Sequence, residues 1–585
     1  MVLVLSKDKL LLYYLRLSKL GVKQELLIPL HEVAEAMFTS ARHCRTILKE
    51  MDNIGWLVWI PKPGRNQRST LELKFKPEEL KMELASQLIS LGKYEKSLAL
   101  LDNDQALFGQ LLQKTSGTSQ REGRLHIQLT YHRPFSELLP HKPLRNSERF
   151  FLRQVYACLT KCDENGNVTP QLAHHWTYNE DEYRWRFFLR PQLSFHDGNE
   201  ITADEVVKLF HALKERPRYK IELAHVTDIV AINPFCVEFK LSQPDFGFSG
   251  LIADGKYSIQ PVSQLLSPAV TIGSGAFKVQ EHTDKRLQLQ AFDNYFACRA
   301  ITETVSIWQV PVQDSDSFGK TALKADALQG GHTICTQYLS VNKSENKKES
   351  YQQTRIENGC LLMLFNHKAN LQDAQRKYLS QILHPTKLMS YLEKMNAHIE
   401  AIPAYNLVPS WIKTFSSPVA PQSLPTQLSI GLFEHQALLG CANAIAEKLN
   451  QLGVNCSIKA YSFEEFHEKA NKSKLEEDLI LTSLNLDDNR PSSALRWLLS
   501  NQVLHQSLAT ENSEWLINKL VQIRQKSNMA DYMNALEPIA TSMIGENWLL
   551  PLYHHKQTLH FEGVLKGVSI TAWGWPSFQD VWSED

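Results

Sequence analysis

The chain is 585 residues long, and 43% of its residues are hydrophobic while 22% are charged. This length and composition predict a globular protein with at least two domains, because one hydrophobic core rarely serves so long a chain. No apolar run approaches the roughly 20 residues that a membrane span needs, which argues against a membrane partner. The formal net charge of zero hides an uneven distribution: residues 1–76 carry 13 basic and 7 acidic side chains (13 − 7 = +6), and the remainder carry 50 and 56 (50 − 56 = −6). A basic N-terminal segment indicates contact with a polyanion.

Three amphipathic helical patterns follow one another in this basic segment. Their apolar positions are Leu10, Leu11, Tyr14 and Leu17; then Leu30, Val33, Ala34 and Met37; then Ala41, Cys44, Ile47, Leu48 and Met51. Only Phe38, Thr39 and Ser40 separate the second pattern from the third, and either Thr39 or Ser40 can cap the third helix. Two helices joined by so short a turn predict a helix-turn-helix unit.

The solvent side of the third helix is rich in cations, and a basic hairpin follows it. Residues 56–60 and 69–75 have strand character, and the turn between them is basic, as in a wing. Arginine can bind guanine bidentately in the major groove, and lysine can neutralise phosphate. The predicted DNA-binding residues are Thr39, Ser40, Arg42, His43, Arg45, Thr46, Lys49, Lys62, Arg65 and Arg68. A small bundle with ordinary solvated cations is the competing interpretation, but it leaves the gathering of cations on both elements unexplained.

Residues 77–123 are predicted to connect this winged helix-turn-helix domain (1–76) to the rest of the chain. Leucines at helical spacing predict helices over 77–114, and the polar, Gly/Ser-rich stretch 115–123 predicts a flexible linker. From Arg124 onward, short strands alternate with amphipathic helices, which indicates an α/β domain.

Three stretches of this second domain carry a specific pattern: Pro170–Trp176, Tyr183–Arg190 and Phe195–Val206. They resemble the signature of the family 5 extracellular solute-binding proteins, the dipeptide, oligopeptide and nickel receptors of ABC importers. Residues 272–278 are similar to a further element of that family, with Ala276 in place of the usual proline. The resemblance covers about 124–585. It implies a bilobed α/β fold of the periplasmic-binding-protein type (type II), with lobe one at about 124–310 and 550–585 and lobe two at about 311–549.

The N-terminal segment narrows the resemblance. Thr39–Arg45, Met51–Trp59 and Gly64–Ser69, together with the C-terminal Gly574–Trp582, are similar to the SgrR-type regulators. That group fuses a winged helix to a family 5 binding domain and responds to sugar-phosphate stress. The resemblance implies a multidomain transcription regulator.

The expected ligand site is a cleft between the two lobes. Asp487 and Asp488 lie where peptide-binding relatives often place an acid for the amine of the ligand, whereas three aromatic side chains can stack on a sugar or pack in the core. Core packing is the favoured interpretation for each aromatic residue. The candidate ligand-binding residues are Tyr257, Asn366, Asp487, Asp488, Trp573 and Trp575.

No pattern in the sequence predicts catalysis, a metal site or a cofactor. His196 and Asp197 precede Gly198 at a sharp turn, and Thr202 is expected to cap the helix that follows, so this motif is interpreted as scaffold. The nine cysteines show no zinc-like spacing and are expected to be reduced thiols.

The sequence therefore predicts a cytoplasmic, ligand-responsive regulator that binds promoter DNA and a small solute such as a sugar phosphate, a sugar or a peptide-like molecule. Lys7, Asp8 and Lys9 interrupt the N-terminal apolar stretch before a signal-peptide core can form. The alternative is the solute-binding component of an ABC transport system, which would have to be exported. A homodimer and a monomer both remain open.

Overall fold

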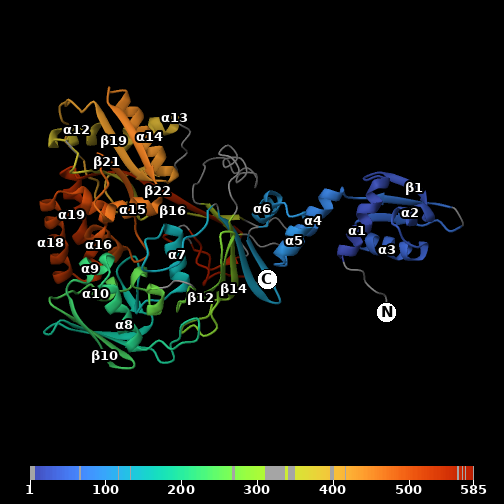
Figure 1. The fold of residues 1–585 in the computed structure, drawn as a ribbon, viewed down its shortest axis with the longest axis horizontal. Helices are drawn as coiled ribbons and strands as arrows, with labels where there is room; N and C mark the ends of the chain where they lie inside the picture. The colour runs from blue at the N-terminus through green and yellow to red at the C-terminus, as the bar shows by residue number, and fades with distance from the viewer. Residues whose placement is uncertain are drawn as a thin grey trace. The chain divides into compact units, whose positions relative to one another are not determined.

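Two units make up the chain, Met1–Ser116 and Gly117–Asp585. The computed structural model describes residues 7–583 except 65–66, 116, 132, 267–269, 310–335, 340–349, 370, 395–400, 416, 563–564, 570 and 574. Each unit has its own hydrophobic core, and each is described by itself (Figure 1). No helix within these described residues is long and apolar enough to span a bilayer.

The first unit begins with the three predicted helices. Their bounds, with those of the strands, are α1 Lys7–Leu17, β1 Glu25–Pro29, α2 Leu30–Ala36, α3 Ala41–Asn53, β2 Leu57–Ile60 and β3 Arg68–Leu73. The strands form an antiparallel sheet in the order β1-β3-β2. The predicted helix, turn, helix and hairpin are confirmed, whereas strand β1 was not predicted.

Three further helices complete the first unit: α4 Pro77–Ser90, α5 Tyr94–Leu100 and α6 Gln105–Lys114. Leu80 and Leu84 of α4 are buried in the same core as the helix-turn-helix. The predicted helices over 77–114 are therefore present, and α4 packs against the helix-turn-helix rather than standing apart from it.

The predicted flexible linker at 115–123 is wrong. Strand β4 (Gly117–Arg121) pairs antiparallel with β5 (Arg124–Tyr131) through a tight turn at Glu122 and Gly123, whose φ angles are 52° and 75°. The exposed edge of β5 supplies backbone partners to a strand whatever its side chains, so a polar, Gly/Ser-rich segment becomes an edge strand. The second unit therefore begins at β4.

The second unit has three hydrophobic cores rather than one for each of two lobes. The first core lies on a five-stranded sheet in the order β12-β13-β14-β5-β4, against helix α7 (Asn146–Val155). The remaining strands of this sheet are β12 Phe277–His282, β13 Arg286–Ala291 and β14 Thr302–Gln309. The second core lies on the sheet β10-β11-β9-β8. Its elements are β8 Ala173–Asn179, β9 Arg184–Leu189, α8 Ala203–Lys214, α9 Pro217–Leu223, β10 Val226–Asn233, β11 Cys236–Leu241, α10 Phe248–Leu251 and η2 Gly255–Tyr257.

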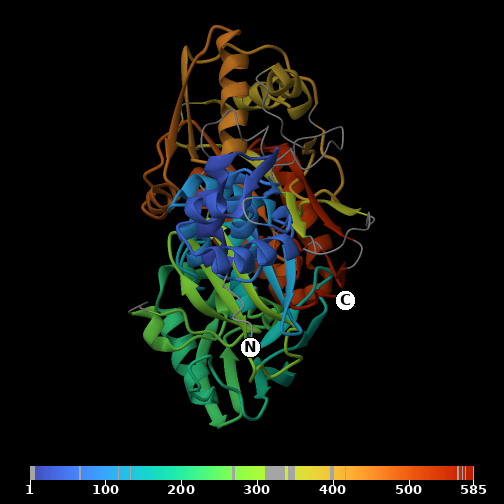
Figure 2. The same ribbon diagram turned by 90° about the vertical axis from the view of Figure 1, so that its right-hand side faces the viewer.

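The third and largest core surrounds an eight-stranded sheet built mainly along β22-β17-β21-β19-β20. Its strands are β15 Thr336–Leu339, β16 Ser350–Ile356, β17 Gly359–Phe365, β18 Ala401–Pro403, β19 Gln427–Phe433, β20 Asn455–Tyr461, β21 Leu479–Asn485 and β22 Leu549–Glu562. Its helices are α12 Asp373–Ile382, α13 Pro385–Lys394, α14 Gln436–Asn450, α15 Phe463–Asn471, α16 Arg490–Ser500, α17 Gln502–Ser507, α18 Thr510–Lys526 and α19 Tyr532–Gly545. Every residue of β17 is buried, as expected for a strand covered on both faces. Figure 2 shows the yellow and orange segments of this part, including α14, at the opposite end of unit 2 from the green second core.

The predicted return of the chain to lobe one at residue 550 is wrong by about a dozen residues. Strand β22 pairs antiparallel with β17, so residues 549–562 belong to the third core. Only the later residues, including Trp573, Trp575 and Phe578, pack in the first core. A strand of alternating apolar residues can join either sheet, and pairing with the buried strand β17 decides the outcome.

Candidate functional site

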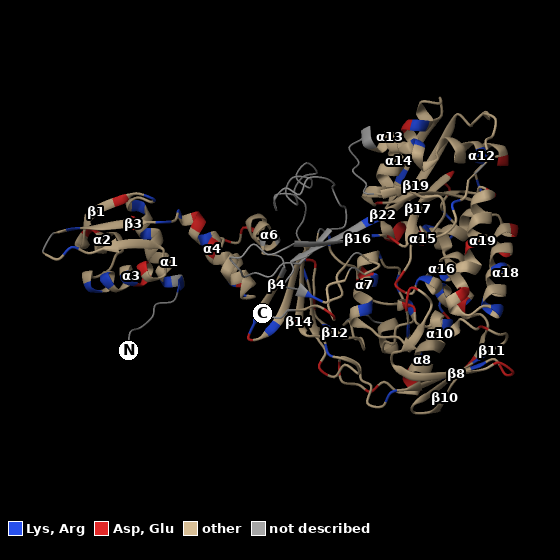
Figure 3. Cartoon of the chain, turned by 180° about the vertical axis from the view of Figure 1, so that it is seen from behind, with Lys and Arg blue, Asp and Glu red and all other residues tan. Residues whose placement is uncertain are grey.

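Helix α3 presents one apolar and one cationic face. Cys44, Ile47, Leu48 and Met51 are fully buried. Ser40 caps the helix, since its Oγ accepts a hydrogen bond from the backbone N–H of His43 at 3.3 Å. The opposite face is exposed at Arg42, Arg45, Thr46 and Lys49. Figure 3 shows the Lys and Arg positions of α3 in blue. Ser40 is thus the cap among the two predicted candidates, while Thr39 is only partly exposed.

The hairpin adds two more exposed cations, Lys62 and Arg68. The backbone N–H of Lys62 donates to Ser69 Oγ at 3.1 Å, which holds the base of the connecting loop. The third predicted cation of the loop, Arg65, lies outside the described residues. His43 is half-buried, with its ring edge-on to Tyr13 at 6.0 Å between centroids, so it belongs partly to the core.

These cations are not neutralised within their own unit. The ion pairs among the described residues of unit 1 join Lys23 to Glu79 and Lys81 to Asp102, and none involves α3 or the hairpin. An amphipathic helix with an uncompensated basic face next to a basic hairpin is the electrostatic footprint of a nucleic-acid interface.

One feature of the helix-helix turn was missed in the sequence. Arg16 of α1 donates to the carbonyl oxygen of Met37 at 2.8 Å, and its guanidinium lies 5.3 Å from the Phe38 ring centroid. Phe38 has a φ of 53° and is 78% exposed. Arg16 therefore stabilises a turn that a bulky residue rarely adopts, and it adds a cation beside α3.

The second candidate site is a small cavity where elements of all three cores of unit 2 meet. Its wall includes Arg149 of α7, Arg218 of α9, Asp254 and Lys256 near η2, and Asp487 and Arg496 around the start of α16. The space is about 20 Å³, enough for roughly one water molecule. A ligand the size of a sugar therefore needs the surrounding elements to separate before it can enter.

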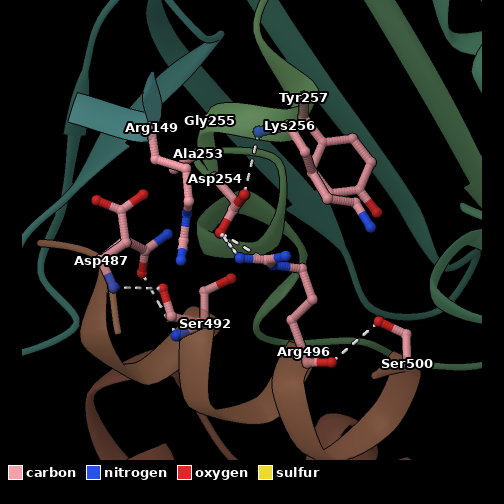
Figure 4. Close-up of polar contacts among 12 residues, drawn as sticks. Arg149, Ala253, Asp254, Gly255, Lys256, Tyr257, Asp487, Ser492, Arg496 and Ser500 are labelled. Atoms are coloured by element: carbon pink, nitrogen blue, oxygen red, sulfur yellow. Dashed lines mark hydrogen bonds and ion pairs between the residues drawn. The ribbon is translucent and has the colours of Figure 1, made fainter. Parts of the chain in front are cut away.

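Ion pairs across the cores line this cavity (Figure 4). Arg153 Nη2 lies 2.7 Å from an Asp487 carboxylate oxygen, and Arg496 Nη2 lies 2.8 Å from one of Asp254. Lys256, which also lines the cavity, has its Nζ 2.7 Å from Glu222. Asp487 thus lines this cavity and is paired with an arginine of the chain itself, and its contact with a ligand stays a prediction.

The other predicted cleft residues divide between wall and scaffold. Asp488 accepts a hydrogen bond from the backbone N–H of Ala572 at 3.0 Å, and burial raises its pKa above the ordinary value. Trp573 lies under Arg149, whose guanidinium carbon is 4.3 Å from the ring centroid. Both residues lie close to the cavity, and their contact with ligand stays a prediction.

The remaining three predicted residues have structural roles. Tyr257 is fully buried and donates to Glu222 at 2.7 Å. Asn366 donates to the backbone carbonyls of Leu475 and Glu477, far along the third core. Trp575 is buried and stacks on Phe150, with its indole N–H directed to Ser147 Oγ at 3.3 Å. Tyr257 and Trp575 are thus packed in cores, the interpretation that the sequence favoured, and the amide of Asn366 is occupied by backbone carbonyls. Contact of these three residues with a ligand stays a prediction.

The His196–Asp197 motif is scaffold, as predicted. The two ring nitrogens of His196 lie within hydrogen-bond distance of Gly275 O and Gly273 N, at 3.0 and 3.3 Å. Asp197 accepts from the N–H of Asn199, and Thr202 caps α8. Among the described residues, no group of three or more His, Cys, Asp or Glu side chains is arranged to hold a metal ion.

A buried acid close to the cavity supplies a pH test. Glu357 is 7% exposed, and the Asn485 and Asn146 amides lie 2.9 and 3.5 Å from its Oε1; burial raises the pKa of Glu357 to about 7. Because the folded pKa lies above the unfolded value of 4.5, unit 2 is expected to lose stability as pH rises from about 4.5 through 7. Glu357→Gln should therefore have a free energy of unfolding about 1–3 kcal/mol above that of the wild type at pH 8, and the same free energy of unfolding at pH 4.5. Thermal unfolding at both pH values checks this, and an equal gain at both would contradict it.

Comparison with known proteins finds a family match for each unit. Residues 9–123 match the family described as Sugar transport-related sRNA regulator N-term, and residues 167–384 match Bacterial extracellular solute-binding proteins, family 5 Middle. Proteins named HTH-type transcriptional regulator SgrR from Shigella flexneri and Photorhabdus laumondii are 29% and 28% identical over 563 and 567 residues, with 94% of each chain covered.

Solved structures resemble unit 2 in fold. The murein tripeptide binding protein MppA of Escherichia coli has a TM-score of 0.58 at 16% identity, covering 80% of this chain and 98% of its own. A dipeptide binding protein from Pseudoalteromonas sp. SM9913 in complex with Met-Leu has a TM-score of 0.61 at 15% identity, covering 78% and 100%. These matches confirm the predicted type II periplasmic-binding-protein fold.

Proposed function

Because the chain joins an SgrR-type N-terminal domain to a family 5 solute-binding domain, as SgrR transcriptional regulators do, we propose that it is a ligand-responsive, DNA-binding regulator of transcription. Unit 1 binds promoter DNA, and unit 2 binds a small solute. The observation that carries the proposal is the uncompensated row of cations on α3 beside a basic hairpin. The relatives are regulators and binding proteins, and the proposal includes no catalysed reaction.

On DNA, α3 lies in the major groove with its cationic face toward the bases and phosphates. Arg42 and Arg45 are placed to contact guanine edges or backbone, and Lys62 and Arg68 on the hairpin bind the flanking phosphates. Each phosphate contact releases condensed counterions, so affinity falls steeply with salt. Ser40 and Thr39 lie at the N-terminus of α3, where backbone N–H groups also favour phosphate.

In unit 2, the solute binds where the three cores meet, and the surrounding elements close around it. The response to the solute depends on its different affinity for the open and closed arrangements. A complete switch from 1:99 to 99:1 needs about 5.5 kcal/mol of such preference. The buried ion pairs between cores stabilise the closed arrangement. Their strength therefore determines how large a difference in affinity between the two arrangements the solute must supply.

We place this function in the cytoplasm, where promoter DNA is accessible. The alternative, a binding protein of a transport system, is supported only by the fold of unit 2. The solved binding proteins cover 78–80% of this chain. The SgrR regulators match 94% of it, which favours a regulator. Cell fractionation separates the two: an exported, mature protein would contradict the regulator.

The direct test is binding of the full chain to a 30-base-pair duplex of mixed sequence, followed by fluorescence anisotropy over a range of salt concentrations. We expect micromolar or tighter binding at low salt, with log K falling linearly as log salt rises. Sedimentation velocity of the free chain and of the complex decides between a monomer and a homodimer. Absence of salt-dependent binding would contradict the proposed function.

A further inference from the structure

The turn between α2 and α3 carries an aromatic side chain at a position that suits glycine. Phe38 has a φ of 53°, in the left-handed region that bulky residues rarely adopt. Its ring is 78% exposed, so burial of the ring does not compensate for this unfavourable conformation. Among the described residues, Phe38 is the most exposed phenylalanine. An unfavourable backbone conformation that holds a ring in solvent indicates a role for the ring beyond the folding of unit 1.

Arg16 of α1 holds this turn in place. Its Nη1 donates to the carbonyl oxygen of Met37 at 2.8 Å, and its guanidinium carbon lies 5.3 Å from the Phe38 ring centroid. The same carbon lies 5.6 Å from the Tyr13 ring centroid, so the guanidinium contacts both rings. Within the described part of unit 1, Arg16 forms no ion pair. These contacts fix the position of the Phe38 ring in advance, so a partner that binds it loses little affinity to side-chain ordering.

Cations surround this ring on α1 and α3. Lys9, Tyr13 and Arg16 lie on one side of α1 at helical spacing. The Tyr13 ring is edge-on to His43, so this side of α1 adjoins the first turn of α3. Lys9 on α1 and Arg42 on α3 are both exposed. An exposed aromatic ring among cations suits a polyanion that also presents apolar groups, and duplex DNA presents thymine methyl groups and sugars next to its phosphates.

We propose that Phe38 contacts DNA through its ring, on a thymine methyl group or a deoxyribose, and that Arg16 is the positioning residue that holds the ring there. This inference rests on the proposed DNA-binding function and deepens it, because the interface then extends from α3 across the turn to α1. It also adds an apolar contact to the cationic ones. An apolar contact releases no counterions, so its contribution to affinity does not depend on salt. This property distinguishes Phe38 from every cation of the interface.

The test replaces Phe38 with asparagine, which adopts a positive φ more readily and has no ring. We expect Phe38→Asn in the full chain to bind a 30-base-pair duplex of mixed sequence about tenfold more weakly. The slope of log K against log salt should stay that of the wild type, and the unfolding temperature should be unchanged or higher. Phe38→Tyr keeps the ring and is expected to bind as the wild type does. Fluorescence anisotropy and thermal unfolding measure these quantities.

A control variant and a modified duplex locate the contact. Phe415→Asn removes a ring that is 71% exposed in unit 2, and it should leave DNA affinity unchanged. In the modified duplex, uracil replaces every thymine and removes the methyl groups. If only proteins that keep the Phe38 ring bind this duplex more weakly, the ring contacts a thymine methyl group; if they bind both duplexes equally, it contacts deoxyribose.

The role of Arg16 is tested by a double variant. Arg16→Ala is expected to weaken DNA binding without changing the salt slope, because Arg16 acts through the Phe38 ring. Arg16→Ala combined with Phe38→Asn should then bind as Phe38→Asn does alone. A further loss of affinity in the double variant, with a salt slope lower by about one, would show that Arg16 binds a phosphate itself and would refute its positioning role.

Three results would contradict the inference. If Phe38→Asn binds DNA as tightly as a wild type whose binding is salt-dependent, the ring does not contact DNA and the proposed function stands. If Phe38→Asn loses affinity together with a homodimer seen by sedimentation velocity, the ring contacts a second copy of the chain instead. If the wild type does not bind the duplex at all, both the inference and the proposed function fail.

Discussion

Replacing Arg42 and Arg45 together with alanine is expected to weaken binding of the full chain to duplex DNA by about 100-fold at moderate salt. Each arginine contact contributes about 1–3 kcal/mol, and 1.4 kcal/mol corresponds to a factor of ten. Both side chains are exposed on α3, away from the buried face, so the fold should not change. The slope of log K against log salt should fall by about two, one for each lost contact. Fluorescence anisotropy with a 30-base-pair duplex measures both quantities.

The matched control is Lys93→Ala with Lys96→Ala, which removes the same charge from exposed positions around α5 of unit 1. If net charge alone attracts the duplex, both double variants will weaken binding equally. If α3 is the contact surface, only the arginine variant will. Unchanged affinity after loss of Arg42 and Arg45 would show that this helix does not face DNA.

The second large effect is expected at a buried triad that joins the second and third cores of unit 2. Arg524 of α18 lies 2.6 Å from Asp245, and His225 lies 3.0 Å from the same carboxylate oxygen. The side chains of Arg524 and Asp245 are 5% and 1% exposed. Asp245→Ala leaves Arg524 buried without a partner and should lower the free energy of unfolding by about 3–5 kcal/mol. Urea unfolding of the full chain, followed by far-ultraviolet circular dichroism, measures this.

The pH dependence of this loss follows from the pKa of Asp245. Burial opposes ionisation most strongly, but the charges and hydrogen bonds of Arg524 and His225 together outweigh it and hold the pKa of Asp245 below its ordinary 3.8. The stabilisation is therefore present above pH 4 and is lost as pH falls through the lower folded pKa. The difference between wild type and variant should shrink below pH 4. Asp181→Ala, at an exposed turn, should change neither stability nor its pH dependence.

The helix-turn-helix could be predicted from sequence because its signals are local. The spacing of Cys44, Ile47 and Met51 defines the buried face of α3, and the arginines fall on the other face by geometry alone. Strand β1 escaped prediction because Leu26, Leu27 and Ile28 give too short a run to distinguish a strand from a helix start. Its identity depends on pairing with β3, some forty residues later in the chain.

The cavity could not be predicted because its chemistry depends on which charges remain unpaired. Arg149 and Arg153 are four residues apart on α7, with no acidic residue between them. This spacing, which places both arginines on one side of the helix, was the one local signal available. Only the fold shows that Asp487 pairs with Arg153 while Arg149 has no acid. Tyr257 and Trp575 illustrate the converse: an aromatic side chain suits a sugar site and a core equally well, and burial decides.

Helix α6 ends at Lys114 and strand β4 begins at Gly117, so only two residues join the units. Three Cα–Cα steps separate Lys114 from Gly117, so the connection spans at most about 11 Å. Strand β4 is also the outermost strand of the sheet that packs on α7, the helix carrying Arg149. A movement of β4 when a solute is captured is therefore expected to reach α6 through the backbone.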